Sequence, residues 1–308
     1  MRSLVALAAG GAALSLVVCS GPRAWAFTGA DNFSTERFDQ TSTQVTNRFL
    51  PMTAGTRYVF DGTVTEGDQT SHHRIVTTIT GVTKLVDGVR ARVVLDQDYD
   101  DGELSEQELA LFAQDTAGVV WALGEYPEEF AGGEFSGAPS TWLAGRAGAT
   151  AGVAMQAAPA TGTPEYNQGF APKIDFDDRG IVTAVGRHTS DTLGGYDDAI
   201  VVTERSAPEP DDGHQLKFHA PGQGVVRIEA VGGKAQETLQ RSAVSTLDTG
   251  ELAQVNAQVL KLDGRAYQNA SGVWTGSAPA TGTTGGAEDG PGQSCQAVPA
   301  GRANLRGC

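Results

Sequence analysis

Apolar and polar residues alternate in short stretches through most of this chain, with glycine-rich breaks between the stretches. Over residues 56–65, Tyr58 and Phe60 alternate with polar neighbours, and residues 74–82 repeat the pattern. An alternation of period two is typical of a β-strand that buries one face. Further short strands are predicted over residues 104–114, 119–121, 152–155, 181–185, 199–204, 215–219 and 225–231.

The strand predicted over residues 89–98 has two clearly different faces. One face carries only apolar residues and the other carries Arg90 and Arg92, so we expect one core face and one solvated face. Asp101-Gly102 then predicts a tight hairpin turn, because these residues readily adopt positive φ. A sandwich, a closed barrel and a half-barrel all fit this spacing of about ten strands. The predicted fold is mainly β, an antiparallel meander that forms a half-barrel or a sandwich.

One amphipathic helix is predicted near the C-terminal end of this domain, over residues 251–268. Asp248 and Glu251 have the spacing of a capping box at its start. Its apolar stripe is expected to pack on the sheet and consists of Leu252, Val255, Val259, Leu262 and Ala266.

Composition divides the chain into four segments. Residues 1–26 have an early arginine, an apolar run and Ala24-Trp25-Ala26, the pattern of a cleaved secretory signal. Residues 27–48 are an irregular lead-in, residues 49–268 are the β-rich domain with its helix, and residues 269–308 are rich in Gly, Thr, Ala and Pro and predict a disordered tail. We therefore expect a secreted protein, extracellular or in the cell envelope, with no transmembrane segment after cleavage. Cys19 follows a valine, which disfavours lipidation.

The charge of the chain limits the classes of partner that we expect, and its cysteines predict a disulfide. The formal charge is −15, and it becomes −17 once a leader with two arginines and no acidic residues is removed. Such an acidic chain repels phosphate groups, so nucleic acids and anionic membranes are not expected partners. Of the three cysteines, Cys295 and Cys308 remain after cleavage and are expected to form a disulfide.

Four segments carry a resemblance to a known group of proteins. Taken in order, with the helix that ends Ala266-Tyr267, they resemble secreted actinobacterial proteins of unknown function; they are residues 49–62, 115–125, 140–145 and 218–226. The Ala-Pro-Gly-x-Gly-Val ending of the last segment is also distantly similar to envelope proteins with a half-barrel of the lipoprotein-carrier type. That similarity implies an open curved sheet with an apolar concave side. Two positions depart from the pattern of the group, Gly118 with its apolar neighbours and His219 in place of tyrosine.

Two polar constellations are candidates for chemistry. Among the acidic residues of 96–108, Asp98, Asp100 and Glu106 could bind calcium, although neighbours on one strand face lie about 6.6 Å apart and a solvated hairpin rim is the alternative. His73, His219 and Asp115 could support hydrolysis if folding brought them together. The chain lacks a nucleophile elbow, a phosphate-binding glycine loop and a cysteine or histidine metal box. No residue is therefore assigned a catalytic role, and no cofactor other than calcium is considered.

Aromatic residues on the predicted strands give the favoured interpretation. Most belong to the core, but some could line a pocket for a lipid or a small apolar ligand on the concave face; these are Trp121, Trp142, Tyr58 and Phe112. We therefore predict non-catalytic binding of an apolar or envelope-derived ligand. A histidine–carboxylate hydrolase and a calcium-dependent extracellular structural module are the alternatives. The oligomeric state is left open.

Overall fold

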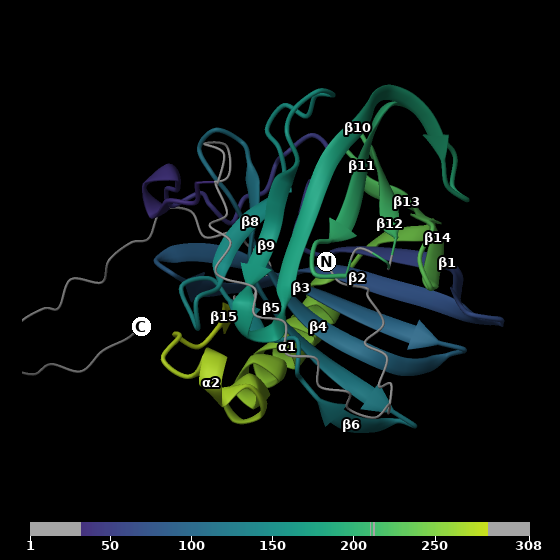
Figure 1. Ribbon diagram of the computed structural model, residues 1–308. Helices are drawn as coiled ribbons and strands as arrows, with labels where there is room; N and C mark the ends of the chain where they lie inside the picture. The colour runs from purple at the N-terminus through teal and green to yellow at the C-terminus, as the bar shows by residue number, and fades with distance from the viewer. Residues whose placement is uncertain (1–31, 210, 212, 283–308) are drawn as a thin grey trace, which may run out of the picture.

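The strands of this protein close into a barrel. The computed structural model describes residues 32–209, 211 and 213–282, and Figure 1 shows its arrangement. The barrel follows the order β1-β14-β13-β12-β11-β10-β9-β8-β5-β4-β3-β2, and β2 pairs with β1 again. Its strands are β1 (Thr56–Glu66), β2 (Gln69–Val86), β3 (Val89–Asp100), β4 (Glu103–Gln114), β5 (Val120–Ala131), β8 (Thr150–Met155), β9 (Tyr166–Ala171), β10 (Phe176–Ser190), β11 (Gly195–Ser206), β12 (His214–Ala220), β13 (Gly224–Val231) and β14 (Ala235–Thr246). All these pairs are antiparallel.

The expected mainly β fold is confirmed, but the sheet forms a closed barrel rather than the expected half-barrel or sandwich. Strand β1 pairs with β2 from Arg57 to Glu66 and with β14 from Thr56 to Glu66, so the meander has no open edge at this point. Alternation along single strands is the same in an open and a closed sheet. Closure depends on pairing between β1 and β14, which lie near opposite ends of the domain sequence, and no local sequence pattern reveals such a pairing.

Gly62 allows β1 and β14 to approach at this closure. A Cβ atom at this position would lie 1.8 Å from the carbonyl oxygen of Thr238, the residue next to its register partner Leu239 on β14. No side chain fits at such a distance, and the obstacle is backbone rather than a movable side chain.

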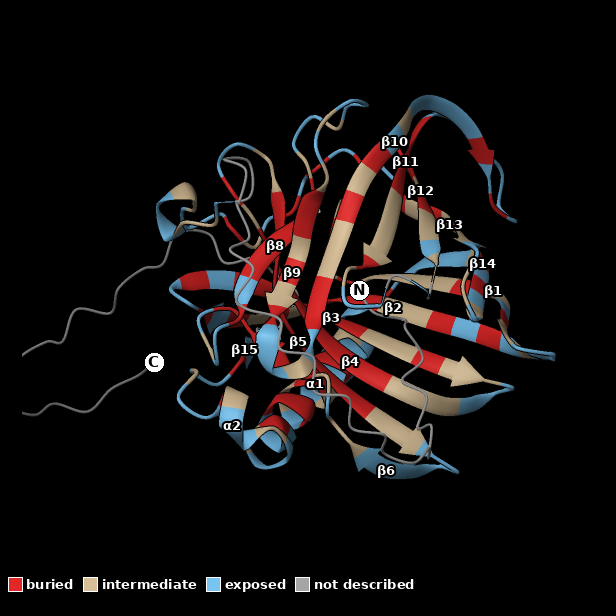
Figure 2. Cartoon of the chain, in the orientation of Figure 1, coloured by how far each residue is buried: buried red, intermediate tan, exposed pale blue. Residues whose placement is uncertain are grey.

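Helix α1 (Thr249–Asn269) covers the outer face of the sheet at β2 and β4. Its predicted capping box is present, with Asp248 accepting from the Glu251 backbone and Glu251 accepting from the Asp248 backbone. The apolar face of β3 that the sequence predicted as core is buried on this side, together with Val259 and Leu262 of the helix. Figure 2 shows the buried residues of the helix turned towards the strands. No helix in the described part of the chain is long and apolar enough to span a membrane.

Defined structure continues past Asn269, the boundary suggested by composition. Helix α2 (Ser271–Trp274) places a fully buried Trp274 against Tyr126, and β15 (Thr281–Gly282) pairs with β2. A buried ion pair between Lys84 and Asp263, 2.8 Å apart, lies beneath this segment. Four short elements complete the described part of the chain: the 3₁₀-helices η1 (Thr35–Arg37) and η2 (Pro172–Ile174), and the strands β6 (Glu134–Gly137) and β7 (Trp142–Leu143). The predicted signal segment and the predicted Cys295–Cys308 disulfide lie outside the described residues.

The second face of β3 meets solvent at Arg90, as predicted, but it is enclosed further along the strand. In the register with β2, Asp96 lies opposite Thr77 and Asp98 opposite Ile75, and these side chains border the barrel interior. Asp96 and Asp98 therefore share one strand face, as the alternation along β3 predicts, whereas the solvated setting expected for this part of the face is wrong. Closure of the sheet is the reason, because it turns a face that would be open in a half-barrel into an inner wall.

Candidate functional site

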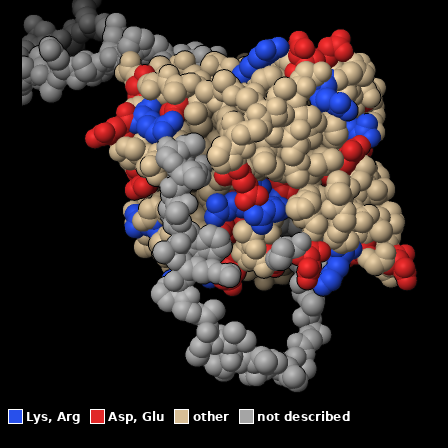
Figure 3. All heavy atoms as spheres, turned by 45° about the horizontal axis from the view of Figure 1, so that its top comes forward, with Lys and Arg blue, Asp and Glu red and all other residues tan. Residues whose placement is uncertain are grey.

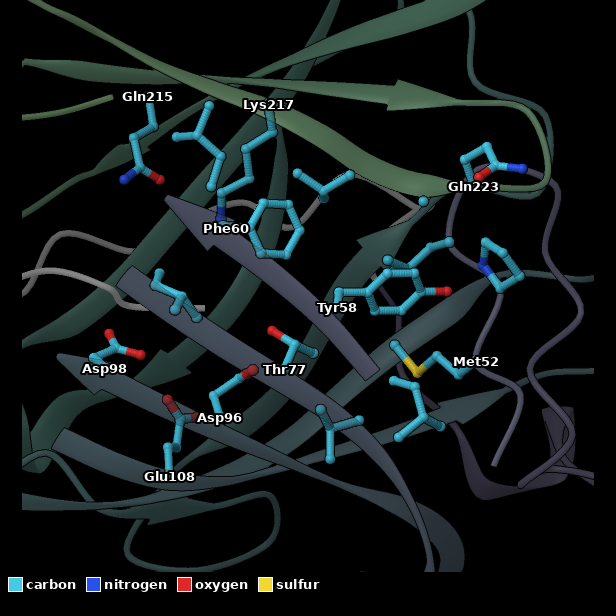
Figure 4. Close-up of a pocket in the computed structure, with 18 of the residues that line it drawn as sticks. Met52, Tyr58, Phe60, Thr77, Asp96, Asp98, Glu108, Gln215, Lys217 and Gln223 are labelled. Carbon is cyan, nitrogen blue, oxygen red and sulfur yellow. The ribbon is translucent and has the colours of Figure 1, made fainter. Parts of the chain in front are cut away.

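A cavity of about 100 Å³ lies inside the barrel. Strands β1, β2, β3 and β4 form one wall, and β12, β13 and β14 form the other (Figure 4). Most of its surface is apolar. The apolar lining comes from Leu50, Pro51 and Met52 before β1 and from Tyr58, Phe60, Ile75, Ile79, Val94, Val225 and Ile228 on the strands.

Carboxyl groups gather on the β3–β4 side of this cavity. Asp96 and Glu108 are register partners on the two strands, and Asp98 is the partner of Glu106. Glu108 is only 5% exposed, and its Oε1 atom has no hydrogen-bond partner among the described residues. The Oδ1 atom of Asp96 is likewise buried and unpartnered within the described chain. The cavity therefore presents two acceptor atoms that no described residue satisfies.

Enclosure changes how these acids titrate. Burial raises the pKa of Asp96 to about 6, with a further contribution from the carboxylate of Glu125. Burial also raises the pKa of Glu108 well above its ordinary value, and the neighbouring carboxylates of Glu125 and Glu106 act in the same direction. These acids hold their protons to higher pH than acids in water.

The opposite wall carries charged groups that are already paired. Lys217 Nζ lies 2.5 Å from Glu204 Oε2, and this partner keeps the pKa of Lys217 raised although burial alone lowers it. Figure 4 shows Lys217 and Gln215 across the cavity from Asp96 and Glu108. Lys217 is thus paired with Glu204 of the neighbouring strand β11, and its charge also acts across the cavity to lower the pKa of Asp96.

His73 sits between two carboxylates at the edge of this region. Its Nδ1 lies 2.7 Å from Asp100 and its Nε2 lies 3.1 Å from Glu237, a residue that lines the cavity. Burial lowers the pKa of His73, but these two carboxylates outweigh it and raise that pKa to about 10. His73 is therefore a charged structural link between β2, β3 and β14 at neutral pH.

A buried arginine on β14, Arg241, connects one end of the cavity to the turn between β10 and β11. Arg241 donates from Nε to Asp191 in the β10–β11 turn at 3.0 Å, and also donates to the backbone oxygen of Gln223. Its guanidinium lies 5.8 Å from the ring of Tyr58, so the cavity wall and the β10–β11 turn share this residue.

Of the four aromatic residues predicted to line a pocket, the structure places Tyr58 at the cavity. Trp121 packs against Phe33 and Phe38 of the N-terminal segment and donates to Asp115 at 3.1 Å. Trp142 and Phe112 are also buried in the core, and neither is among the residues that line the cavity.

The three residues considered for hydrolysis have separate surroundings. Asp115 accepts from the backbone nitrogens of Ala117 and Val119 and so shapes its own hairpin turn. His219 contacts the carbonyl oxygen of Phe49, and burial lowers the pKa of His219 to about 4. No hydrogen bond or ion pair among described residues joins His73, His219 and Asp115.

The residues considered for calcium binding are split between two settings. Asp98 and Glu106 are register partners, whereas Asp100 pairs with His73. Across the described chain, no group of three or more His, Cys, Asp or Glu residues is arranged to hold a metal ion. The calcium site therefore stays a prediction without a preformed set of ligands.

Part of the acidic excess is directed inward rather than displayed outside. Figure 3 shows acidic and basic side chains intermingled on the face in view. The sequence had signalled Asp96 and Glu108 only as members of an acidic run. It gave no sign that Lys217 and Glu237 would lie across the cavity from them, because those residues are more than 100 residues further along the chain.

Comparison with known proteins identifies no family. No protein-family model and no curated protein matches the chain. Among solved structures, a candidate exported protein with a YmcC-like fold from Bacteroides fragilis is 10% identical, with a TM-score of 0.40, and the match covers 65% of this chain and 100% of that one. A candidate lipoprotein from Parabacteroides distasonis is 12% identical, with a TM-score of 0.38, and covers 65% and 99%.

Proposed function

We propose that this protein binds a small apolar molecule in the interior of its barrel, without catalysis. The observation that carries the proposal is the cavity of about 100 Å³ lined mainly by apolar side chains. Ligand sites are typically concave and mostly apolar with a few polar groups, and this cavity has that composition. The signal-like pattern of residues 1–26 supports a location outside the cytoplasm for this activity.

The size of the cavity favours a small ligand over a lipid. A cavity of about 150 Å³ in another protein holds benzene, so this one suits a short apolar body. For five non-hydrogen atoms, a ceiling of about 1.5 kcal/mol per atom gives at most about 7.5 kcal/mol. Dissociation constants are thus expected between a few micromolar and the millimolar range.

The experiment is a ligand titration followed by NMR chemical shifts, with straight-chain alcohols from butanol to octanol. We expect saturable shifts for the short alcohols in residues that line the cavity. Val225→Phe should abolish them, because a larger side chain at this half-buried wall position fills the cavity. Val231→Phe is the matched control, since Val231 lies on the same strand β13 and is 48% exposed. Equal binding by wild type and Val225→Phe would refute the proposal.

Neither alternative function has a comparable preformed site among residues 32–209, 211 and 213–282. A hydrolase needs a free base, whereas both ring nitrogens of His73 face carboxylates. A calcium-dependent module would show binding heat on titration with calcium, and the loss of that heat in Asp98→Asn would support it.

A further inference from the structure

We infer that the ligand of the barrel carries a small cationic group, such as a primary amine, that pairs with Glu108 and Asp96. This inference rests on the proposed function and adds the chemical class of the ligand. Its basis is a mainly apolar lining that is interrupted on the β3–β4 side by carboxyl oxygens that the described residues leave unsatisfied.

Glu108 is the strongest sign of a missing partner. Its side chain is almost fully buried, it borders the cavity, and its Oε1 atom accepts no hydrogen bond from the described protein. A buried carboxyl without a partner is costly to the fold, so a position of this kind indicates a group supplied from outside.

Asp96 makes the position suitable for one ammonium group. It is the register partner of Glu108, and side chains of such partners on one face have Cβ atoms about 4.5–5.5 Å apart. Its Oδ1 atom is unsatisfied too. An ammonium has three donors and no acceptor, which matches two neighbouring carboxyl oxygens.

The charge of the cavity points in the same direction. Asp96, Asp98, Glu108 and Glu237 line it, and Lys217 is the basic residue in that lining. Lys217 forms an ion pair with Glu204, and Glu237 forms a separate ion pair with His73. Once Asp96 and Glu108 are ionised, the β3–β4 wall therefore offers negative charge to a cation bound beside the apolar residues.

The alternative is a neutral ligand that accepts hydrogen bonds from the protonated forms of Asp96 and Glu108. The pH dependence of the binding affinity distinguishes this neutral ligand from a cationic one. Glu108 faces Asp96 on β3, Glu106 on its own strand, Glu125 on β5 and Lys217 across the cavity. A cation favours the ionised carboxyl, so its affinity should rise from pH 5 to pH 8, where the amine stays charged. A neutral acceptor should lose affinity over the same range.

The test compares n-butylamine with n-butanol, which have the same number of non-hydrogen atoms. In wild type at pH 8 we expect the amine to bind at least about tenfold more tightly, the effect of one charge-assisted hydrogen bond. Glu108→Gln should reduce amine affinity to that of the alcohol and leave the alcohol unchanged. Glu103→Gln is the control, because it makes the same charge change at an exposed position of the same strand.

The outcomes separate the two proposals. Equal or tighter binding of the alcohol in wild type would overturn the cationic ligand and leave the apolar site standing. Binding of neither compound would overturn both. Asp96→Asn provides a second variant with a partial loss of amine affinity expected, and the wild-type comparison stands even if a variant does not fold.

Discussion

Replacing Asp96 by asparagine should stabilise the protein above pH 6 and have little effect near pH 4. Burial raises the pKa of Asp96 from its ordinary 3.8 to about 6. The folded state therefore holds this proton more tightly than the unfolded state, and ionisation disfavours folding. Asparagine is nearly the same shape and has no charge to bury.

The magnitude follows from the two pKa values. At 1.36 kcal/mol per pKa unit, the wild type is destabilised by about 3 kcal/mol once Asp96 is ionised in both states. This penalty is absent below pH 3.8, grows between about pH 4 and 6, and is constant above that range. Because Asp96 also helps to raise the pKa of Glu106 and Glu108, its removal relieves those acids as well.

The assay is urea unfolding followed by tryptophan fluorescence, at pH values between 4 and 8. Asp96→Asn should exceed wild type by about 3 kcal/mol at pH 8 and by well under 1 kcal/mol at pH 4. Glu103→Gln is the control, since it removes an acidic charge from an exposed site on β4. A loss of stability at pH 8, or a gain that does not change with pH, would refute the reasoning.

Three further substitutions test the packing around the cavity by the same unfolding assay. Arg241→Met leaves Asp191 buried without its cation and should cost about 3–5 kcal/mol, whereas a cost below about 1 kcal/mol would contradict a structural role for the pair. His73→Leu should cost most near pH 6 and progressively less as pH rises from about 6.5 towards 10, because the charged form of His73 is the stabilising one; a constant cost would count against its raised pKa. Gly62→Ala should cost about 3 kcal/mol or more, since its Cβ would meet backbone, and unchanged stability would argue against closure of the barrel here.

Local features of the fold were predictable from sequence. Asp101 and Gly102 have φ of 50° and 88°, the positive values expected of the Asp-Gly hairpin. The capping box of Asp248 and Glu251 is also present as predicted. Both depend on residues within three positions of each other, where the sequence carries the relevant physical information.

The candidate site was less predictable, because it depends on distant pairings. Alternation placed Asp96 and Asp98 on one face, but only closure of the barrel makes that face internal. Acidic residues are usually exposed to solvent, so the sequence favoured a solvent-exposed position for Glu108 at the edge of a hairpin. The carboxylate Glu237 beside His73 lies on another strand far along the chain, and no spacing rule connects them.

The most direct test of the account is to locate a bound ligand inside the barrel. We would measure nuclear Overhauser effects between n-butylamine and the methyl groups of the protein at pH 8. Contacts from its alkyl protons to Ile75 and Ile228, both at the cavity wall, are the predicted result. Contacts confined to exposed apolar residues such as Leu193, or no contacts at saturating ligand, would contradict an internal binding site.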